Sequence, residues 1–169
     1  AADTIHEAIE YYRLLKNNDK GLFVTAVFDP HTDNADDDIF KDKGVEEILN
    51  HYNTHFNFKF TAGAYRRFKD DVCSRLAHRE PYANIDPRRE EAVNIVIVVN
   101  QLLTGFDSKW INALYLDKVI DYERFVQAAS RTNRLNGYEK QYGIIKYCRK
   151  PYTMEKNALA ALKLYTETG

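Results

Sequence analysis

The sequence predicts an α/β protein in which a parallel β-sheet is flanked by helices. Short apolar segments alternate along the chain with longer segments in which apolar residues recur every three or four positions. This alternation is typical of βαβ units, whose strands pair in parallel and whose connecting helices pack on the sheet. The chain has no internal repeat, low-complexity segment or linker rich in Pro, Gly or Ser. We therefore expect residues 1–169 to form a single domain.

Apolar spacing predicts the helices. The first begins at Ile5 and ends at Leu15, and Asp121 is placed to cap a later helix that contains the segment QAASRTNR. Three further helices are expected over residues 45–56, 65–76 and 153–167. The aromatic residues of these segments fall at helical spacing, which favours core packing over base stacking. The helix over 65–76 also carries basic residues on its other faces, namely Arg66, Arg67, Lys69, Arg75 and Arg79.

Apolar runs predict the strands, which we expect over residues 22–28, 93–99, 113–117 and 143–148. The run VNIVIVV is the most apolar and suits a strand buried on both faces. The chain starts with a helix at Ile5, whereas a fold of this kind starts with a strand. We therefore expect a sheet that lacks its first strand, in a chain cut from a longer one.

Charge and cysteine content limit the function classes. Lysine plus arginine number 24 and aspartate plus glutamate 25, so a protein that binds nucleic acid through bulk positive charge is disfavoured, although a local basic face is compatible. Cys73 and Cys148 have no His or Cys at ligand spacing, which predicts neither a disulfide framework nor a metal site. No apolar segment approaches the ~20 residues of a membrane helix, and the chain opens with no secretion signal. We expect a cytoplasmic protein without membrane contact.

The tetrapeptide TGFD follows the strand expected over 93–99. Ligands of open α/β sheets lie at the carboxyl ends of the strands. Gly105 lets the backbone approach a ligand closely, and Asp107 can accept hydrogen bonds from hydroxyl groups or from an arginine. The alternative is a plain tight turn in which Asp107 caps the next element. The tetrapeptide alone favours that alternative.

The segment QAASRTNR places Gln127, Arg131 and Arg134 at positions i, i+4 and i+7 of an expected helix, so they share one face. Two guanidinium groups on one face repel each other unless an anion lies between them. Arginine suits phosphate oxygens and stabilises charge on a transferring phosphoryl group in nucleotide motors. The alternative is a solvated basic face near the end of a helix, where the helix dipole favours cations.

Taken together, residues 99–134 resemble motifs V and VI of superfamily 2 helicases and translocases. They look most like the motor, or R, subunit of type I restriction enzymes, which shows an LTGFDS turn, a strand ending in Asp-Lys and a Q-x-x-S-R-T-N-R helix. The flanking YGIIKY segment fits as well. The resemblance implies a RecA-like sheet flanked by helices, in the second motor domain of an ATP-dependent, double-stranded DNA translocase. It also implies membership of a type I site-specific deoxyribonuclease, a restriction-modification endonuclease.

The resemblance also implies roles for individual residues. Arg131 and Arg134 match the catalytic arginines that reach the triphosphate bound by the other motor domain. Gln127, Gly105 and Asp107 match nucleotide-binding positions, and Thr104 a contact to a DNA phosphate. Many helicases open motif V with Thr-Asp where this chain has Val99-Asn100, which leaves the DNA contact of those first residues open.

The sequence has no G-x-x-x-x-G-K-[ST] phosphate loop and no apolar strand ending in Asp-Glu. The resemblance therefore implies that ATP and Mg are bound mainly by a first RecA-like domain of the full-length chain, and that the isolated segment is inactive. The implied partners are double-stranded DNA, that first domain, and the methyltransferase and specificity subunits. The alternative function is a RecA-like docking module without motor activity. A stand-alone nucleotide-binding protein is disfavoured by the missing phosphate loop.

Overall fold

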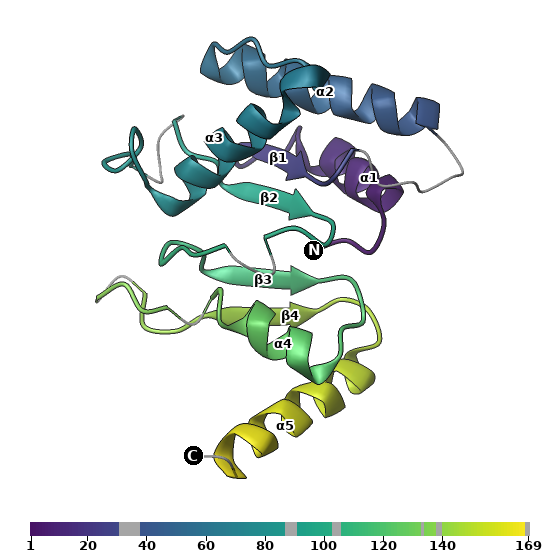
Figure 1. The fold of residues 1–169 in the computed structure, drawn as a ribbon, viewed down its shortest axis with the longest axis vertical. Helices are drawn as coiled ribbons and strands as arrows, with labels where there is room; N and C mark the ends of the chain where they lie inside the picture. Colours follow the sequence, from purple (N-terminus) through teal and green to yellow (C-terminus); the bar gives the residue numbers. More distant parts are fainter. Residues whose placement is uncertain (31–37, 87–90, 103–105, 133, 138–139, 168–169) are drawn as a thin grey trace. The chain divides into compact units, whose positions relative to one another are not determined.

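The computed structural model describes residues 1–30, 38–86, 91–102, 106–132, 134–137 and 140–167. They form two compact units, one of residues 2–101 and one of residues 102–169 together with Ala1. Each unit contains one pair of parallel strands with helices packed on it (Figure 1). The parallel, helix-flanked α/β architecture predicted from the sequence is thereby confirmed. The expectation of a single domain over 1–169 stays a prediction.

The N-terminal unit is built on strands β1 (Val24–Val27) and β2 (Ile95–Val98), which pair in parallel with Val24 opposite Ile95. Ala2 adds a single parallel bridge to Val99. The helices of this unit are α1 (Ile5–Leu15), α2 (Asp38–Phe56) and α3 (Tyr65–Ala77), and the short helix η1 (Ala62–Ala64) precedes α3. Helix α2 begins seven residues before the apolar spacing at Val45 indicated, because the only large apolar residues of its first two turns, Ile39 and Phe40, are adjacent and give no periodic signal.

Helix α1 shows how local sequence fixes an element. Thr4 accepts a hydrogen bond from the backbone N–H of Glu7, and the Glu7 side chain accepts one from the N–H of Thr4, which completes a capping box. Ile5, Ala8, Ile9 and Tyr12 form the buried stripe of the helix.

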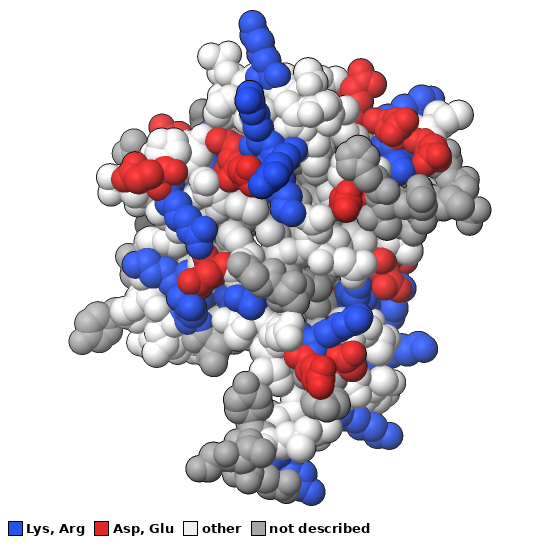
Figure 2. Space-filling view, viewed as in Figure 1, with Lys and Arg blue, Asp and Glu red and all other residues white. Residues whose placement is uncertain are grey.

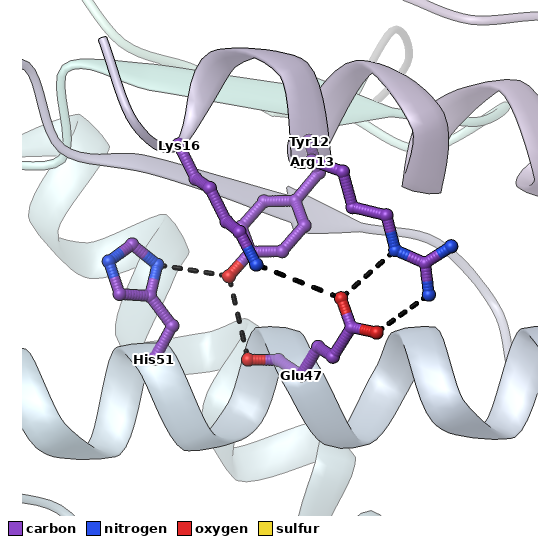
Figure 3. Close-up of polar contacts among 5 residues, drawn as sticks. All are labelled: Tyr12, Arg13, Lys16, Glu47 and His51. Atoms are coloured by element: carbon purple, nitrogen blue, oxygen red, sulfur yellow. Dashed lines mark hydrogen bonds and ion pairs between the residues drawn. The ribbon is translucent and has the colours of Figure 1, made fainter. Parts of the chain in front are cut away.

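A polar clamp joins α1 to α2 (Figure 3). The Arg13 guanidinium donates two hydrogen bonds to the Glu47 carboxylate, at 2.7 and 3.0 Å, and these hold the pKa of Glu47 below its usual value. The Tyr12 hydroxyl lies 3.0 Å from Nδ1 of His51. Burial raises the pKa of Tyr12 and lowers that of His51, so the neutral forms of both side chains are favoured. Lys16 also approaches Glu47, at 3.8 Å.

A second polar group, which we call the Arg75 cluster, consists of Tyr52, Asp71, Arg75 and Tyr82. Arg75 is 6% exposed and donates to Asp71 Oδ2 at 2.9 Å, to the Tyr82 hydroxyl at 3.1 Å and to the Glu91 carbonyl at 2.8 Å. The hydroxyls of Tyr52 and Tyr82 donate to the two oxygens of Asp71. The expectation that Arg75 lies on an outer face of its helix is therefore wrong. Residue 75 continues the stripe of Phe68 and Val72, and its charge is compensated inside the unit.

Aromatic side chains surround this cluster. The guanidinium of Arg75 lies 3.8 Å from the ring centre of Phe56 and 4.0 Å from that of Tyr82. The ring of Phe23 packs edge-on against Phe56, with centroids 4.7 Å apart. Among the aromatic residues, Tyr12, Tyr52 and Phe68 are fully buried. Core packing, expected from their helical spacing, is thus confirmed for these side chains.

The C-terminal unit contains strands β3 (Ala113–Leu116) and β4 (Ile144–Tyr147), which run parallel with Ala113 opposite Ile144. Helices α4 (Tyr122–Ala129) and α5 (Pro151–Glu167) pack against each other and share a core with Leu116 of β3. Ala1 joins this unit through its amino group, which donates to the Tyr115 carbonyl, and through its own carbonyl, which accepts from Asp117. The core lies between helices and strands and consists of Leu116, Ile120, Phe125, Ala128, Met154, Ala158 and Ala161.

Cys73 is half-buried and Cys148 is exposed, and both thiols are free. Burial raises the pKa of the Cys73 thiol. Within the described ranges, no helix combines the length and apolarity needed to cross a membrane.

Candidate functional site

The candidate site lies in the C-terminal unit, where the segment after residue 105 meets the segment that leaves α4. Helix α4 is fixed at its start by Asp121, whose side chain accepts a hydrogen bond from the N–H of Arg124 at 2.9 Å, as predicted. Its apolar face, which includes Phe125 and Ala128, packs into the core of the unit. These contacts set the direction in which the chain leaves the helix toward Arg131 and Arg134.

Helix α4 ends at Ala129, so the prediction that Gln127, Arg131 and Arg134 share one helix face is wrong. The N–H groups of Arg131 and Thr132 bond to carbonyls three residues back, a tighter pattern than that of an α-helix. The hydroxyls of Ser130 and Thr132 also donate to the carbonyls of Gln127 and Ala129. Carbonyls occupied in this way stop the helix before its arginines.

Both arginines nevertheless reach the segment that carries Asp107. Nη1 of Arg131 donates to the carbonyl oxygen of Phe106 at 2.7 Å. Nη1 of Arg134 lies 2.8 Å from Oδ2 of Asp107. The two segments identified in the sequence are therefore in contact in the structure, through residues that lie 25 and 27 positions apart in the chain.

The Asp107–Arg134 pair is open to solvent. Its side chains are 41% and 60% exposed, and ion pairs of this kind contribute about 0–1 kcal/mol to stability. The pair is therefore not needed to hold the fold. An exposed guanidinium keeps N–H groups available for the oxygens of an incoming phosphate, which a planar fork can bind in bidentate fashion.

The other predicted site residues do not take part in these contacts. Gln127 lies in the last turn of α4 with an exposed side chain, and in the described part of the chain no hydrogen bond joins that side chain to Asp107 or to either arginine. Thr104 and Gly105 lie outside the described residues. The structure thus brings together three of the predicted residues, Asp107, Arg131 and Arg134.

Lys140, which the sequence did not single out, anchors the same region. Its side chain is 6% exposed, and Nζ donates to the carbonyl oxygens of Lys109 and Ile111 at 3.2 and 2.6 Å. Burial lowers the pKa of this ammonium group. The residue ties the segment after Asp107 to the segment before β4. A lysine between a glutamate and a glutamine gives no sequence signal for such a role.

Gly143 lets the chain pass Thr132 at close range. A Cβ atom on Gly143 would lie 2.2 Å from the Thr132 carbonyl oxygen and 2.7 Å from its Cβ atom. Thr132 is itself 2% exposed and stands between the two arginines. The absence of a side chain at position 143 therefore sets the path of the arginine segment.

We expect Gly143→Ala to destabilise the protein by about 1–3 kcal/mol, the usual cost of overpacking, because backbone atoms must move to admit the methyl group. Thermal unfolding followed by circular dichroism measures the effect. Gly63→Ala is the matched control, since its Cβ atom would meet nothing closer than 4.0 Å. Equal melting temperatures for the two variants would contradict this account of Gly143.

The N-terminal unit has a cavity of its own, about 280 Å³ in volume, at the carboxyl ends of β1 and β2. Two carboxylates, those of Asp3 and Asp29, line it beside the capped start of α1. Asn100, one of the two residues that depart from the usual opening of motif V, also lines it and has a left-handed backbone with φ of 53°. Carboxylates disfavour an anion, so this cavity is not arranged for a phosphate.

The fold and the site define an α/β protein with paired arginines beside an aspartate at the end of a strand–helix unit. Residues 1–150 match the model of the family described as Type I restriction enzyme subunit R domain 3. The chain belongs to this family, and so forms part of the R subunit of a type I restriction enzyme.

Individual relatives agree with this assignment. The endonuclease subunit of the type I restriction enzyme SauMRSORF196P from Staphylococcus aureus (strain MRSA252) is 31% identical over 174 residues, which covers 98% of this chain and 18% of the relative. The SsaAORF53P endonuclease subunit of Staphylococcus saprophyticus is 43% identical over 79 residues, covering 47% of this chain and 8% of the relative. The chain thus spans less than a fifth of the Staphylococcus aureus protein that it matches.

Proposed function

We propose that the chain is the second, RecA-like motor domain of a type I restriction R subunit that translocates double-stranded DNA at the expense of ATP. Arg131 and Arg134 are the residues that act on ATP bound by a partner RecA-like domain of the same full-length chain. The observation that carries the proposal is that both arginines converge on the Phe106–Asp107 segment, with the exposed Asp107–Arg134 pair only 2.8 Å long.

The chemistry required of these residues is charge stabilisation. When a γ-phosphoryl group is transferred, negative charge spreads over its oxygens, and a guanidinium placed beside them lowers the barrier. Asp107 holds the Arg134 side chain near its working position and neutralises it while no phosphate is present. Arg131 is oriented by the Phe106 carbonyl and is the second guanidinium assigned to the phosphate. We assign the exposed Gln127 side chain a contact to the nucleotide.

The residues present fit the phosphate end of ATP, but they do not supply a complete nucleotide site. The sequence lacks a phosphate loop and an Asp-Glu strand end, so the partner domain must bind ATP and Mg. Bound ATP and Mg would supply the phosphoryl group and the metal that neutralises its oxygens. In the complete enzyme, the partners are double-stranded DNA and the methyltransferase and specificity subunits, and the overall activity is ATP-dependent cleavage of DNA.

The isolated segment 1–169 is expected neither to hydrolyse Mg-ATP nor to bind it with micromolar affinity, because it provides arginines but no phosphate cradle. Isothermal calorimetry and a phosphate-release assay measure the two properties, and circular dichroism verifies that the segment is folded. Adding the separately produced first motor domain is expected to raise phosphate release. Turnover by the folded segment alone would overturn the proposed division of labour.

A further inference from the structure

Helix α3 and the residues around it concentrate positive charge in a protein whose net charge is −1. Residues 59–79 contain six lysines and arginines but only two aspartates. Figure 2 shows blue side chains over the region where Figure 1 places α3, with red side chains beside them. The motor function proposed above makes no use of this charge.

The structure separates the cations that are available from those that are not. Arg75 is buried within the Arg75 cluster, and Asp71 is held there by Arg75 and two tyrosine hydroxyls. Arg66 and Arg67 are exposed and Lys69 is partly exposed. We call these three residues the α3 cationic face. Asp70 is the one carboxylate exposed on the helix itself, and Glu80 follows it at the exit.

Spacing brings Arg66 and Lys69 to one side of the helix. Lys69 follows Arg66 by three residues and precedes Cys73 by four, so all three share a stripe. Arg67 flanks it. At a rise of about 1.5 Å per residue, Arg66 and Lys69 are about 4.5 Å apart along the helix axis.

Helix stability does not explain this arrangement. The helix dipole favours acidic residues in a first turn, whereas the first turn of α3 contains Arg66 and Arg67 and no acidic residue. Other cations of the unit are paired, as Arg13 is with Glu47 and Lys41 with Asp38. Across the described residues, no carboxylate lies within 4 Å of a side-chain nitrogen of Arg66, Arg67 or Lys69. The geometry is that of a surface arranged for an external anion.

We infer that the α3 cationic face binds the phosphate backbone of duplex DNA. The inference rests on the proposed function, in which duplex DNA is the track of the motor. The three cations lie within about one helical turn, close enough to contact neighbouring phosphates of one strand. Guanidinium and ammonium groups on a helix side contact phosphates without reading bases, as a translocase that moves over any sequence requires. The buried face of α3, fixed by Phe68, Val72 and the Arg75 cluster, holds the cations rigidly outward.

The test removes this charge in the full-length R subunit. The variant Arg66→Gln/Arg67→Gln/Lys69→Gln is compared with Lys20→Gln/Lys43→Gln/Lys156→Gln, which removes the same charge from exposed positions elsewhere. Fluorescence anisotropy gives the Kd for a duplex of about 30 base pairs between about 50 and 200 mM salt. We expect the α3 variant to bind at least about tenfold more weakly, with the slope of log K against log salt reduced by about 3.

Three outcomes would overturn the inference. The first is a salt slope equal to that of the control variant. The second is an equal loss of duplex affinity in the control variant. The third is a loss of affinity for a single-stranded oligonucleotide without a loss of affinity for the duplex. Circular dichroism verifies folding. If the triple variant melts early, the three single substitutions replace it, and each is expected to lower the salt slope by about 1.

ATPase activity measured as a function of DNA concentration distinguishes the DNA-binding inference from the proposed motor function. High DNA concentrations are expected to restore turnover to the α3 variant but not to Arg131→Ala, and a wild type without DNA-stimulated ATPase would refute the motor function alone.

Discussion

Replacing Arg131 or Arg134 by alanine in the full-length R subunit is expected to lower DNA-stimulated ATP hydrolysis by about 10³-fold or more. A guanidinium that neutralises the transferring phosphoryl group contributes about 10³–10⁵ to the rate in nucleotide hydrolases. Mg-ATP binding is expected to be largely retained, because the phosphate cradle belongs to the partner domain. Steady-state phosphate release measures the rate, and calorimetry measures nucleotide affinity.

The contacts of the two arginines allow a sharper comparison. Arg131→Lys retains a charge but not the planar fork that donates to Phe106, so it is expected to recover little activity. Asp107→Asn keeps the shape of the Arg134 partner without its charge and is expected to be milder than loss of the arginine. Arg124→Ala removes an exposed arginine of α4 that is 3.8 Å from Asp121, and serves as the control. If both alanine variants retain activity within about threefold of wild type, the arginines are a solvated surface feature.

Much of this site could be predicted from local patterns. The four apolar runs became the four strands, because short β-branched stretches between turn residues have few other ways to bury themselves. Asp121 was identified as a helix cap since the capping interaction spans only three residues. The TGFD and QAASRTNR segments were both assigned to the nucleotide site, and Asp107 of the first is in contact with Arg134 of the second.

The features that the sequence did not predict depend on contacts between residues that are distant in the chain. Helical spacing extended α4 through Arg134, but the helix stops at Ala129, where Ser130 and Thr132 occupy its last carbonyls and Thr132 packs against Gly143. The sequence does not indicate which backbone segment will pack against a glycine that precedes a strand. Helix propensity reflects only residues that are close in the sequence. This helix end is set by the contact of Thr132 with Gly143, eleven residues away.

The position of Arg75 was mispredicted for the same reason. From its charge alone, Arg75 was expected to lie on a solvent-exposed face of its helix. Its position, seven residues after Phe68 and three after Val72, belongs to the buried stripe of α3. The groups that make burial possible lie partly on other elements, namely the Tyr52 hydroxyl, the Tyr82 ring and the Glu91 carbonyl. Burial and the hydrogen bond to Asp71 raise the pKa of Tyr82 to about 12, so its hydroxyl remains a donor at any physiological pH.

Arg75→Ala is therefore expected to destabilise the protein by about 3–5 kcal/mol, the cost typical of breaking a buried ion pair by removing one partner. The Asp71 side chain, 13% exposed, would keep two hydroxyl donors but lose its counter-charge. The carbonyl of Glu91 would lose the guanidinium as a donor, and the ring of Phe56 would lose the cation stacked 3.8 Å above it. Urea unfolding followed by circular dichroism measures the change in free energy.

Two further variants identify the cause. Arg75→Met retains the apolar stem but not the charge, so it separates lost packing from lost pairing. Combined with Asp71→Asn, it removes both charges and is expected to recover part of the stability, since the unpaired carboxylate is the main penalty. Arg66→Ala, an exposed arginine in the same helix, is expected to change stability by no more than about 0.5 kcal/mol. A cost of under 1 kcal/mol for Arg75→Ala would mean that water replaces the guanidinium and that the cluster does not hold α3 in place.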